Sequence, residues 1–209
     1  MVTKPISPRT MGRLPIYYRY LEDLQRLGVE RISSDQLAQR IGITGSQLRQ
    51  DLSAFGQFGH HGLGYHVGPL LERVSELLGL KQPHRLVLVG AGNLGRAVAS
   101  YAGFARRGVR IGRIFDVDPQ LIGTEIAGVP VAPMRDLGAY LASEHIDVGI
   151  IATPAASAQE TADILVAGGV RAIWNFAPLR LTVPDRVLVE HTHIIDSLLH
   201  LSLRLHMQE

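Results

Sequence analysis

The sequence predicts an α/β protein built in two parts, a helical N-terminal region followed by a doubly wound parallel sheet. Two observations support this division. Up to about Gly79, apolar residues recur at three- and four-residue spacing, which is typical of helices. After Pro83, short β-rich runs alternate with helical runs near residues 94–106, 134–145 and 155–167, which is the pattern of βαβ units. The stretch LGLKQPHR marks the boundary, and it predicts domains over residues 1–79 and 80–192 with a terminal helix over 193–209.

The composition indicates a globular, cytoplasmic protein. The chain has 209 residues, 46% of them hydrophobic, which is enough for one large domain or two modest ones. The start of the chain lacks the apolar segment of a signal peptide, and no run of eighteen apolar residues occurs, so no membrane association is expected. The absence of cysteine excludes disulfides, thiolate nucleophiles and cysteine-ligated metals.

The first predicted helix carries a basic N-terminal arm. Six apolar or aromatic residues share one face of it: Leu14, Tyr17, Tyr18, Leu21, Leu24 and Leu27. The first nineteen residues contain no acidic residue and four basic ones: Lys4, Arg9, Arg13 and Arg19. This local excess suits a DNA phosphate backbone, with Arg13 as the candidate contact, or else a solvated arm.

Two short helices follow in RISSDQLAQRIGITGSQLRQDLSAFG, and both begin at a capping-box spacing, Ser33 with Gln36 and Thr44 with Gln47. Gly42 permits a sharp turn between them. Six residues are expected to be buried: Leu37, Ala38, Ile41, Ile43, Leu48 and Leu52. The pattern predicts a helix-turn-helix over about residues 17–56, although structural bundles also join two helices through glycine.

The second of these helices, near residues 45–55, is the predicted recognition helix. Its candidate contacts to base edges or phosphates in a major groove are Ser46, Gln47, Arg49 and Gln50. The next segment, FGQFGHHGLGY, places glycines between aromatic residues and predicts a β-hairpin wing. In this wing His60 and His61 are candidates for backbone or minor-groove contacts. The alternative is a connecting hairpin that contacts only the core.

The segment LVLVGAGNLGRAVASYAGF runs from a strand through a Gly-x-Gly-x-x-Gly turn into a helix. In a dinucleotide site of the Rossmann type, Gly90 permits the tight turn, Gly92 the approach of the pyrophosphate and Gly95 close helix-strand packing. Amides at the helix start would bind the pyrophosphate. The candidate contacts around these glycines are Ala91, Asn93, Leu94 and Arg96.

Asp116 ends the strand pattern RIGRIFD, 21 positions after Gly95, where a carboxylate binds the adenosine ribose hydroxyls and repels a 2′-phosphate. The cofactor is therefore predicted to be NAD or NADH rather than the phosphorylated forms. Asp118 is expected to cap the turn before Pro119. The nicotinamide end is predicted at the ends of later strands, in a small apolar pocket that would prefer neutral NADH by desolvation: Thr153, Pro154, Phe176, Ala177 and Pro178.

The chain leaves little room for an enzyme's substrate domain, because only about thirty residues follow Pro178. The terminal helix IIDSLLHLSLRLHMQE is apolar nearly all round, so we expect it to insert into a partner subunit, the alternative being a core helix of its own domain. No catalytic residue is predicted, and His145 and His193 are disfavoured in that role. No metal site is predicted, since the histidine pairs lack carboxylates at ligand spacing.

The residues carry a family resemblance across essentially the full length. The segments are LPIYYRYLEDL, VERISSDQLA, LRQDLSAFGQFG, GLGY, LVGAGNLGRA, FDVDP, NFAPLRL and the apolar C-terminal helix. Together they resemble the Rex family of bacterial redox-sensing transcriptional repressors. The resemblance implies a homodimer with an exchanged C-terminal helix, a two-fold related double-stranded operator, and release of DNA when NADH replaces NAD⁺. It also implies that Tyr101 rearranges near the nicotinamide.

Three positions depart from the family pattern. Gln50 stands where a second basic residue is common, and His61 where the wing usually carries Arg or Lys, which leaves operator affinity and sequence preference open. In a related sensor an arginine of the first helix, here Arg19, pairs across the dimer with an aspartate at the position of His193. The switch is therefore expected to use another acceptor, Asp196, or to respond to pH through His193.

The leading hypothesis is an NADH-responsive DNA-binding repressor that acts as a two-state dimer. Two alternatives remain at this point. One is a small NAD-dependent oxidoreductase whose N-terminal helices serve dimerisation only. The other is a non-redox nucleotide-binding subunit similar to CoA-binding folds, which Asp116 disfavours.

Overall fold

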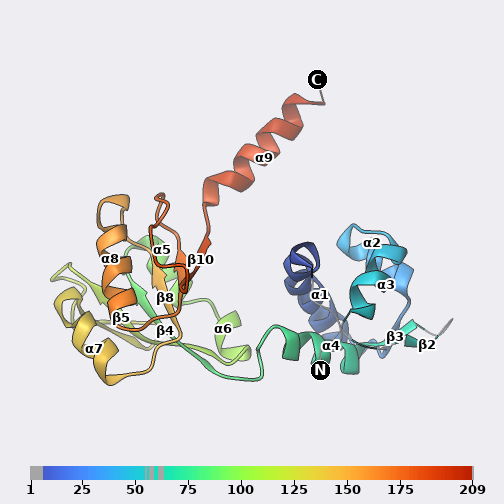
Figure 1. Ribbon diagram of the computed structural model, residues 1–209, viewed down its shortest axis with the longest axis horizontal. Helices are drawn as coiled ribbons and strands as arrows, with labels where there is room; N and C mark the ends of the chain where they lie inside the picture. The colour runs from blue at the N-terminus through green and yellow to red at the C-terminus, as the bar shows by residue number, and fades with distance from the viewer. Residues whose placement is uncertain (1–6, 55, 57–58, 61–63, 209) are drawn as a thin grey trace. The chain divides into compact units, whose positions relative to one another are not determined.

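The computed structural model describes residues 7–54, 56, 59–60 and 64–208. The chain divides into two compact units, Met1–Gln82 and Pro83–Glu209. Figure 1 shows the chain as a ribbon, with labels on its helices and on some of its strands.

In the N-terminal unit a group of helices packs with a small antiparallel sheet, whose strand order is β1-β3-β2. The described helices are α1 Pro8–Arg26, α2 Ser34–Ile41, α3 Gly45–Ser53 and α4 Val67–Leu77. The strands are β1 Arg31–Ile32, β2 Gly59–His60 and β3 Gly64–His66. The pairing of β2 with β3 is the hairpin expected for a wing.

Local sequence signals account for the helix boundaries in this unit. The Ser33 side chain accepts the Gln36 amide while the Gln36 side chain accepts the Ser33 amide, so the predicted capping box is complete. Gly42 ends α2 in the left-handed conformation, with φ of 73°, which favours glycine. The sharp turn between α2 and α3 therefore follows from the sequence.

The core of this unit lies on the predicted helix faces. Leu14, Tyr17, Leu21 and Leu24 of α1 are buried, but Leu27, expected on the same face, is 71% exposed because the helix has already ended at Arg26. Tyr18 is only partly buried. Of the residues expected to be buried in the helix-turn-helix, Leu37, Ala38, Leu48 and Leu52 are buried, and Ile41 and Ile43 lie partly buried against the same cluster.

The C-terminal unit contains a seven-stranded sheet of order β10-β9-β8-β4-β5-β7-β6. All pairings are parallel except that of β6 with β7. The strands are β4 His84–Val89, β5 Val109–Asp116, β6 Glu125–Ile126, β7 Val129–Pro133, β8 Val148–Ile151, β9 Ala172–Asn175 and β10 Leu188–His191. The predicted doubly wound sheet is confirmed, and its order reverses between β4 and β8, where such sheets bind ligands.

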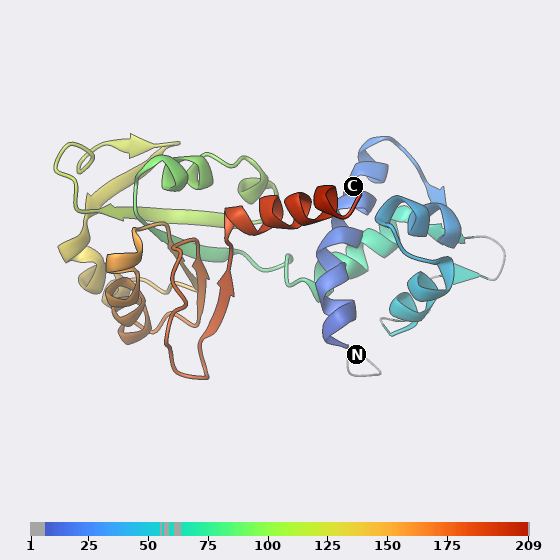
Figure 2. The same cartoon turned by 90° about the horizontal axis from the view of Figure 1, so that it is seen from above.

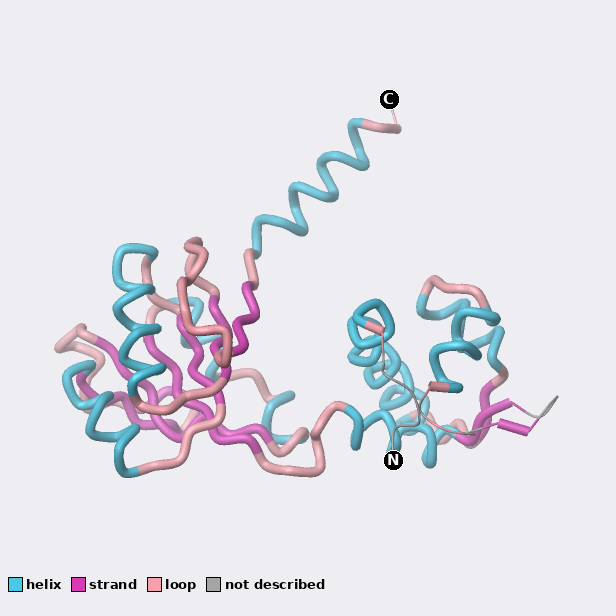
Figure 3. The backbone as a smooth tube through the Cα atoms, viewed as in Figure 1, coloured by secondary structure: helices cyan, strands magenta, loops and turns pink. Residues whose placement is uncertain are grey.

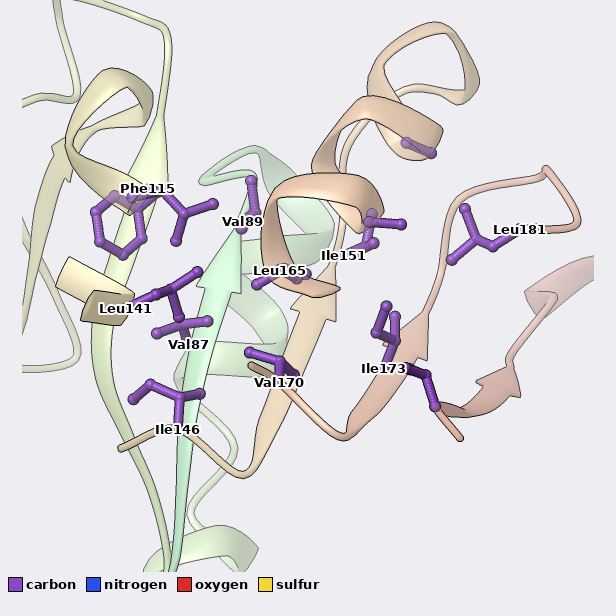
Figure 4. Close-up of a cluster of buried hydrophobic side chains, with 14 of the residues drawn as sticks. Val87, Val89, Phe115, Leu141, Ile146, Ile151, Leu165, Val170, Ile173 and Leu181 are labelled. Atoms are coloured by element: carbon purple, nitrogen blue, oxygen red, sulfur yellow. The ribbon is translucent and has the colours of Figure 1, made fainter. Parts of the chain in front are cut away.

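Helices cover both faces of this sheet, as Figure 2 shows. They are α5 Asn93–Ala99, α6 Gly103–Arg106, α7 Leu137–Ser143 and α8 Ala155–Ala167, with a 3₁₀ turn, η1 Met134–Asp136, before α7. A cluster of buried side chains joins α7 and α8 to the sheet, with Val87, Phe115, Leu141, Leu165 and Ile173 among its members (Figure 4). A second cluster fills the opposite face beneath α5.

The single helix expected near residues 94–106 is wrong, because two short helices occupy this stretch. The Tyr101 amide bonds the Val98 carbonyl three residues back, and the Phe104 amide then bonds the Tyr101 carbonyl. Such tightened bonds close α5 and start α6 in a new direction. Tyr101 consequently lies in a connection between two helices.

The last helix, α9 Ile194–His206, continues from β10 (Figure 3), and each of its residues is exposed in the single chain. Its large apolar residues are more than half exposed: Ile194, Ile195, Leu198, Leu199, Leu201, Leu203 and Leu205. Monomeric proteins rarely expose so much contiguous apolar surface. The alternative of a core helix in its own domain therefore does not hold within this chain.

Candidate nucleotide and DNA-binding sites

The glycine-rich turn after β4 has the geometry that its predicted role requires. Gly90 has φ of 101°, and a Cβ added there would lie 2.5 Å from the Ala152 carbonyl oxygen. A Cβ on Gly95 would overlap the Gly90 carbonyl oxygen, so α5 packs against the turn with no room for a side chain. A Cβ on Gly92 would meet nothing within 4 Å. The turn is thus closely packed on its inner side and open at Gly92, which suits a pyrophosphate.

Asp116 fastens this turn. Its Oδ2 accepts the Ala91 amide at 2.5 Å and its Oδ1 accepts the Asp118 amide at 2.8 Å. Arg96 Nε donates to the Ala91 carbonyl at 3.1 Å. The Ala91 side chain is buried, so only its backbone can face a ligand. Asp118 Oδ1 accepts the Gln120 amide at 2.9 Å, as expected of a turn cap.

Helix α5 begins directly after Gly92 and has no side-chain cap. The first amides of a helix lack intrahelical partners, and here they belong to the residues predicted to bind the pyrophosphate. Asn93 is exposed at this end, whereas Leu94 packs partly into the core. Leu94 can therefore contribute its amide but little of its side chain.

The ends of β8 and β9 lie next to each other, because Phe176 donates its amide to the Ile151 carbonyl at 2.9 Å. Thr153 Oγ1 is buried without a hydrogen-bond partner. Buried polar atoms normally have partners, so this hydroxyl suits a polar ligand group, such as the carboxamide of a nicotinamide ring. Pro154 and Pro178 are both more open to solvent.

Ala177 is the predicted contact that fits least well. Its side chain is buried in the cluster beneath α8, and its amide and carbonyl are both bonded to the Asn175 side chain, at 3.0 and 3.2 Å. Asn175, which was not among the predicted contacts, is fully buried and also donates to the Leu179 carbonyl at 2.8 Å. Ala177 therefore shapes the loop, and Asn175 holds that shape.

Tyr101 and Phe176, predicted near the nicotinamide from distant parts of the sequence, belong to one chain of aromatic contacts. Tyr101 is 57% exposed and meets Phe104 edge-on at 5.1 Å between ring centroids. Phe104 contacts Trp174 at 6.2 Å, and Trp174 contacts Phe176 at 4.7 Å. Phe104 and Trp174 were missed, because nothing in their local sequence signals that the fold brings them together.

The predicted recognition helix is α3. Ser46, Arg49 and Gln50 are exposed on it, and Arg49 Nη1 lies 3.5 Å from Asp35 Oδ1 in an exposed pair that DNA can displace. Gln47 is half-buried, and its Nε2 donates to Asp51 Oδ1 at 3.0 Å. Its side chain therefore does not complete the capping box expected with Thr44. The Thr44 hydroxyl accepts the Gln47 amide at 3.2 Å and also bonds the Ser46 hydroxyl at 2.9 Å.

Arg13 lies within the N-terminal unit, bound to an acid on the recognition helix. Its Nε lies 2.7 Å from Asp51 Oδ2 and its Nη2 2.9 Å from Oδ1. Tyr17 and Thr10 also donate to the Asp51 carboxylate, so α1 is tied to α3 by a charged network. Arg13 thus has a structural role within the N-terminal unit. The contact to DNA that the sequence predicts for it would have to form while its bonds to Asp51 stay in place.

Asp51 is 2% exposed. Its negative charge is balanced by the hydrogen-bond donors around it, including the Arg13 guanidinium. Burial acts to raise its pKa, but the hydrogen bonds from Arg13, Tyr17 and Gln47 outweigh this effect and hold the pKa below the ordinary value. Burial raises the pKa of the Tyr17 hydroxyl, and the bond to Asp51 raises it further. Asp51 was missed because an acid in a recognition helix has no local signature.

The remaining predicted DNA contacts lie in the wing. The backbone of His60 pairs with Gly64 in the hairpin, and His61 lies outside the described residues. Gly64 has φ of 70°, and a Cβ there would overlap the Ile32 carbonyl oxygen of β1. Only glycine allows β3 to lie so close to β1 at this point.

The predicted switch residues occupy separate units. Arg19 is exposed on α1, Asp196 is exposed in the first turn of α9, and His193 precedes that helix with its ring stacked on His191 at 6.1 Å. The pairing of Arg19 with Asp196 stays a prediction. His145 bonds Asp147 at 3.2 Å at the amino end of β8, the opposite edge of the sheet from Thr153.

Among the residues that the structure describes, no group of three or more His, Asp or Glu could hold a metal ion. Nor does this part of the chain contain a helix that is long and apolar enough to cross a bilayer.

A helix-turn-helix unit joined to a parallel sheet with a dinucleotide-type turn defines a class of protein, the nucleotide-responsive DNA-binding regulators. Comparisons with known proteins agree. Residues 5–53 match the family described as putative DNA-binding protein N-terminus, and residues 81–179 match the CoA binding domain family. The second match covers strands β4 to β9 of the sheet.

Curated relatives cover nearly the whole chain. The redox-sensing transcriptional repressor Rex of Clostridium botulinum (strain Alaska E43 / Type E3) is 46% identical over 98% of each chain. That of Clostridium beijerinckii is 49% identical over 95% of this chain and 94% of the relative. This chain belongs to the Rex family of redox-sensing transcriptional repressors, and it is accordingly a regulator rather than an enzyme.

Solved structures of a Rex-family repressor named RSP resemble the chain closely. Its complex with β-NAD⁺ and operator DNA matches with a TM-score of 0.91 and 43% identity, over 99% of this chain and 95% of that one. Its complex with β-NADH matches with a TM-score of 0.90 and 42% identity, over 99% and 97%. The predicted fold class, with a DNA-binding N-terminal domain and a Rossmann-like sheet, is confirmed by these matches.

Proposed function

We propose that this chain is a repressor that binds double-stranded operator DNA as a homodimer and releases it when NADH replaces NAD⁺. The observation that carries the proposal is the joining of an exposed recognition helix, α3, to a glycine-rich turn fastened by Asp116. The Rex relatives support it, because one RSP structure holds NAD⁺ with operator DNA and another holds NADH. The site of action that we propose is the cytoplasm.

The dinucleotide would lie across the carboxyl ends of the strands. We propose that amides after Gly92 meet the pyrophosphate and that Asp116 accepts bonds from the adenosine ribose. Each Asp116 oxygen accepts one backbone bond and keeps capacity for another. At the other end, Thr153 Oγ1 would gain the partner that it lacks, beside the ring of Phe176. Oxidised nicotinamide is a cation, and apolar surroundings penalise it relative to the reduced ring.

On the DNA side we propose that α3 enters a major groove, with Arg49 the strongest contact and Ser46 and Gln50 beside it. Gln47 and Arg13 would act mainly by holding α3 through Asp51. His60 and His61 would contact the DNA backbone or the minor groove from the wing. The domain division that we propose is a reader over residues 1–79, a sensor over 80–192 and an exchanged arm over 193–209.

The test is a titration of operator binding against the NADH/NAD⁺ ratio. We expect the Kd for operator to rise at least tenfold as NADH replaces NAD⁺ at a fixed total concentration, which is within the usual range of allosteric coupling. Operator binding that NADH does not weaken, at concentrations that saturate the protein, contradicts the proposal. Steady oxidation of NADH with a carbonyl substrate favours the oxidoreductase instead.

Arg49→Ala tests the reader separately. We expect a loss of operator affinity of about tenfold to a hundredfold, since a good base contact contributes about 1–3 kcal/mol. NADH binding should not change. The matched control is Arg135→Ala, an arginine that is 83% exposed in the other unit and should leave operator affinity as it is.

A further inference from the structure

The carboxyl ends of β9 and β10 are joined by more than their strand ladder. The Thr192 amide donates to the Asn175 carbonyl at 2.9 Å. Trp174 Nε1 donates to Thr192 Oγ1 at 2.8 Å, and Asn175 Nδ2 bonds His191 Nδ1 at 3.1 Å. Neighbouring side chains in a strand point to opposite faces, so the two side-chain bonds tie the strands on both sides of the sheet. We call Trp174, Asn175, His191 and Thr192 the strand-end junction.

One side of the strand-end junction meets the loop proposed to hold the nicotinamide. Asn175 is fully buried and fixes the loop backbone through its bonds to Ala177 and Leu179. Trp174 packs on the ring of Phe176 at 4.7 Å, and on Phe104, which in turn contacts Tyr101. A displacement of either proposed nicotinamide neighbour, Phe176 or Tyr101, therefore reaches Trp174 through packed rings.

The other side of the strand-end junction meets α9. Only His193 separates Thr192 from the first residue of that helix, and the helix has no side-chain cap at this end. The direction in which α9 leaves the sheet therefore depends on how Thr192 is held. Thr192 is held by Asn175 through its backbone and by Trp174 through its side chain.

We infer that the strand-end junction couples the nicotinamide loop to α9, with Trp174 and Thr192 as positioning residues of the switch. A nicotinamide ring that presses on Phe176 or Tyr101 shifts Trp174. The hydrogen bond from the Trp174 indole N–H then carries that shift to Thr192 and the start of α9. The inference rests on the proposed function, since it explains how occupancy of that site changes the dimer. Because coupling is reciprocal, operator binding must also alter NADH affinity through the same bond.

Thr192→Val tests this bond, because valine keeps the side-chain volume and removes the acceptor for Trp174. We expect the Kd for operator without NADH, and the Kd for NADH without DNA, to stay within about threefold of wild type. The factor by which saturating NADH weakens operator binding should fall at least tenfold, a loss within the usual range of coupling. Thr192→Ser keeps the hydroxyl and should restore that factor. The matched control is Thr182→Val, at an exposed position in the same unit, and it should behave as wild type.

Trp174 supplies an independent readout, because it is the only tryptophan in the chain. Its emission should respond to NADH in wild type and in Thr192→Val alike, which shows that the variant is folded and loaded. If the variant then keeps the full effect of NADH on operator binding, the inference is overturned. If wild type itself shows no effect of NADH on operator binding, the proposed function fails instead. Should Thr192→Val not fold, Trp174→Phe removes the same donor, and full coupling in it overturns the inference too.

Discussion

At the scale of single residues, Asp51 shows how a predicted recognition helix can depend on a buried side chain that lies beneath its exposed residues. Its carboxylate is nearly fully buried on the recognition helix and bound by Arg13, Tyr17, Thr10 and Gln47. A charge in this position is tolerated only because its donors replace water. The network fixes the rotation of α3, and hence which residues α3 presents.

Asp51→Ala should lower the free energy of unfolding of the N-terminal unit by about 3 kcal/mol, because it leaves the Arg13 charge and the Tyr17 hydroxyl without their partner. Urea denaturation followed by circular dichroism measures this change. The matched control is Asp35→Ala, which removes an acid that is 84% exposed and should cost less than about 1 kcal/mol. Equal losses in the two variants would show that the network does not stabilise the unit.

The same residue predicts a pH dependence. The pKa of Asp51 lies lower in the folded protein than in the unfolded chain, so its stabilising contribution is complete above the unfolded value, about 3.9. The contribution is lost as the pH falls through the folded value. Wild type should therefore lose stability below about pH 4 more steeply than Asp51→Asn, in denaturation curves recorded at each pH. Parallel losses in the two proteins would contradict this account.

At the scale of elements, the sequence predicts most of what is built from local signals. The capping box at Ser33, the turn at Gly42 and the alternation of strands and helices after Pro83 each depend on neighbouring residues. Glycine spacing and Asp116 likewise predict a site whose parts lie within one βαβ unit. What could not be predicted depends on distant contacts. Arg13 meets an acid 38 positions away, and Trp174 of β9 meets Phe104 of α6, which lies far from it in the sequence.

The division of residues 94–106 into α5 and α6 belongs to the same group of misses. Helical periodicity runs through this stretch, and no proline interrupts it. The break between the two helices places the Tyr101 ring against Phe104. Phe104 packs in turn on Trp174, so this contact depends on residues far away in the sequence. Periodicity reports which residues can lie on one face, but it does not report where tertiary packing ends a helix.

At this scale we also expect helix α9 to form the dimer contact. Its large apolar side chains are all more than half exposed, and an isolated helix of 13 residues is marginal in water, so we expect it to be covered by a second copy. Leu198→Glu with Leu201→Glu should shift the protein from dimer to monomer at micromolar concentration in sedimentation experiments. Operator affinity should fall with it, because a dimer reads two half-sites.

The matched control for this variant is Ser197→Glu, which adds a charge to the same helix at an exposed polar position. It should leave the dimer intact. If the double variant sediments like the control, α9 does not form the dimer.

At the scale of the whole molecule, NADH can act only through a difference in its affinity for two arrangements of the dimer. Moving the equilibrium from 1:99 to 99:1 requires about 5.5 kcal/mol of differential affinity. Two sites in a dimer would each supply about half of this, an amount that a few desolvated contacts and one ion pair can provide. The response should therefore be steeper than binding at a single site.

The ion pair that we expect to favour the DNA-free arrangement joins Arg19 to Asp196 of the other subunit, because His193 occupies the position of the usual acid. Asp196→Ala should then reduce the factor by which NADH weakens operator binding by about threefold to tenfold, since an exposed pair contributes up to about 1 kcal/mol and a dimer has two. Gel-shift titrations with and without NADH measure that factor. Asp185→Ala, at another exposed acid of the same unit, should not change it.

Arg19→Ala should have the same effect as Asp196→Ala, and the double variant no more than either one, because the pair is lost only once. Unchanged release of DNA by NADH in Asp196→Ala would remove Asp196 as the partner of Arg19 and leave His193 as the remaining candidate.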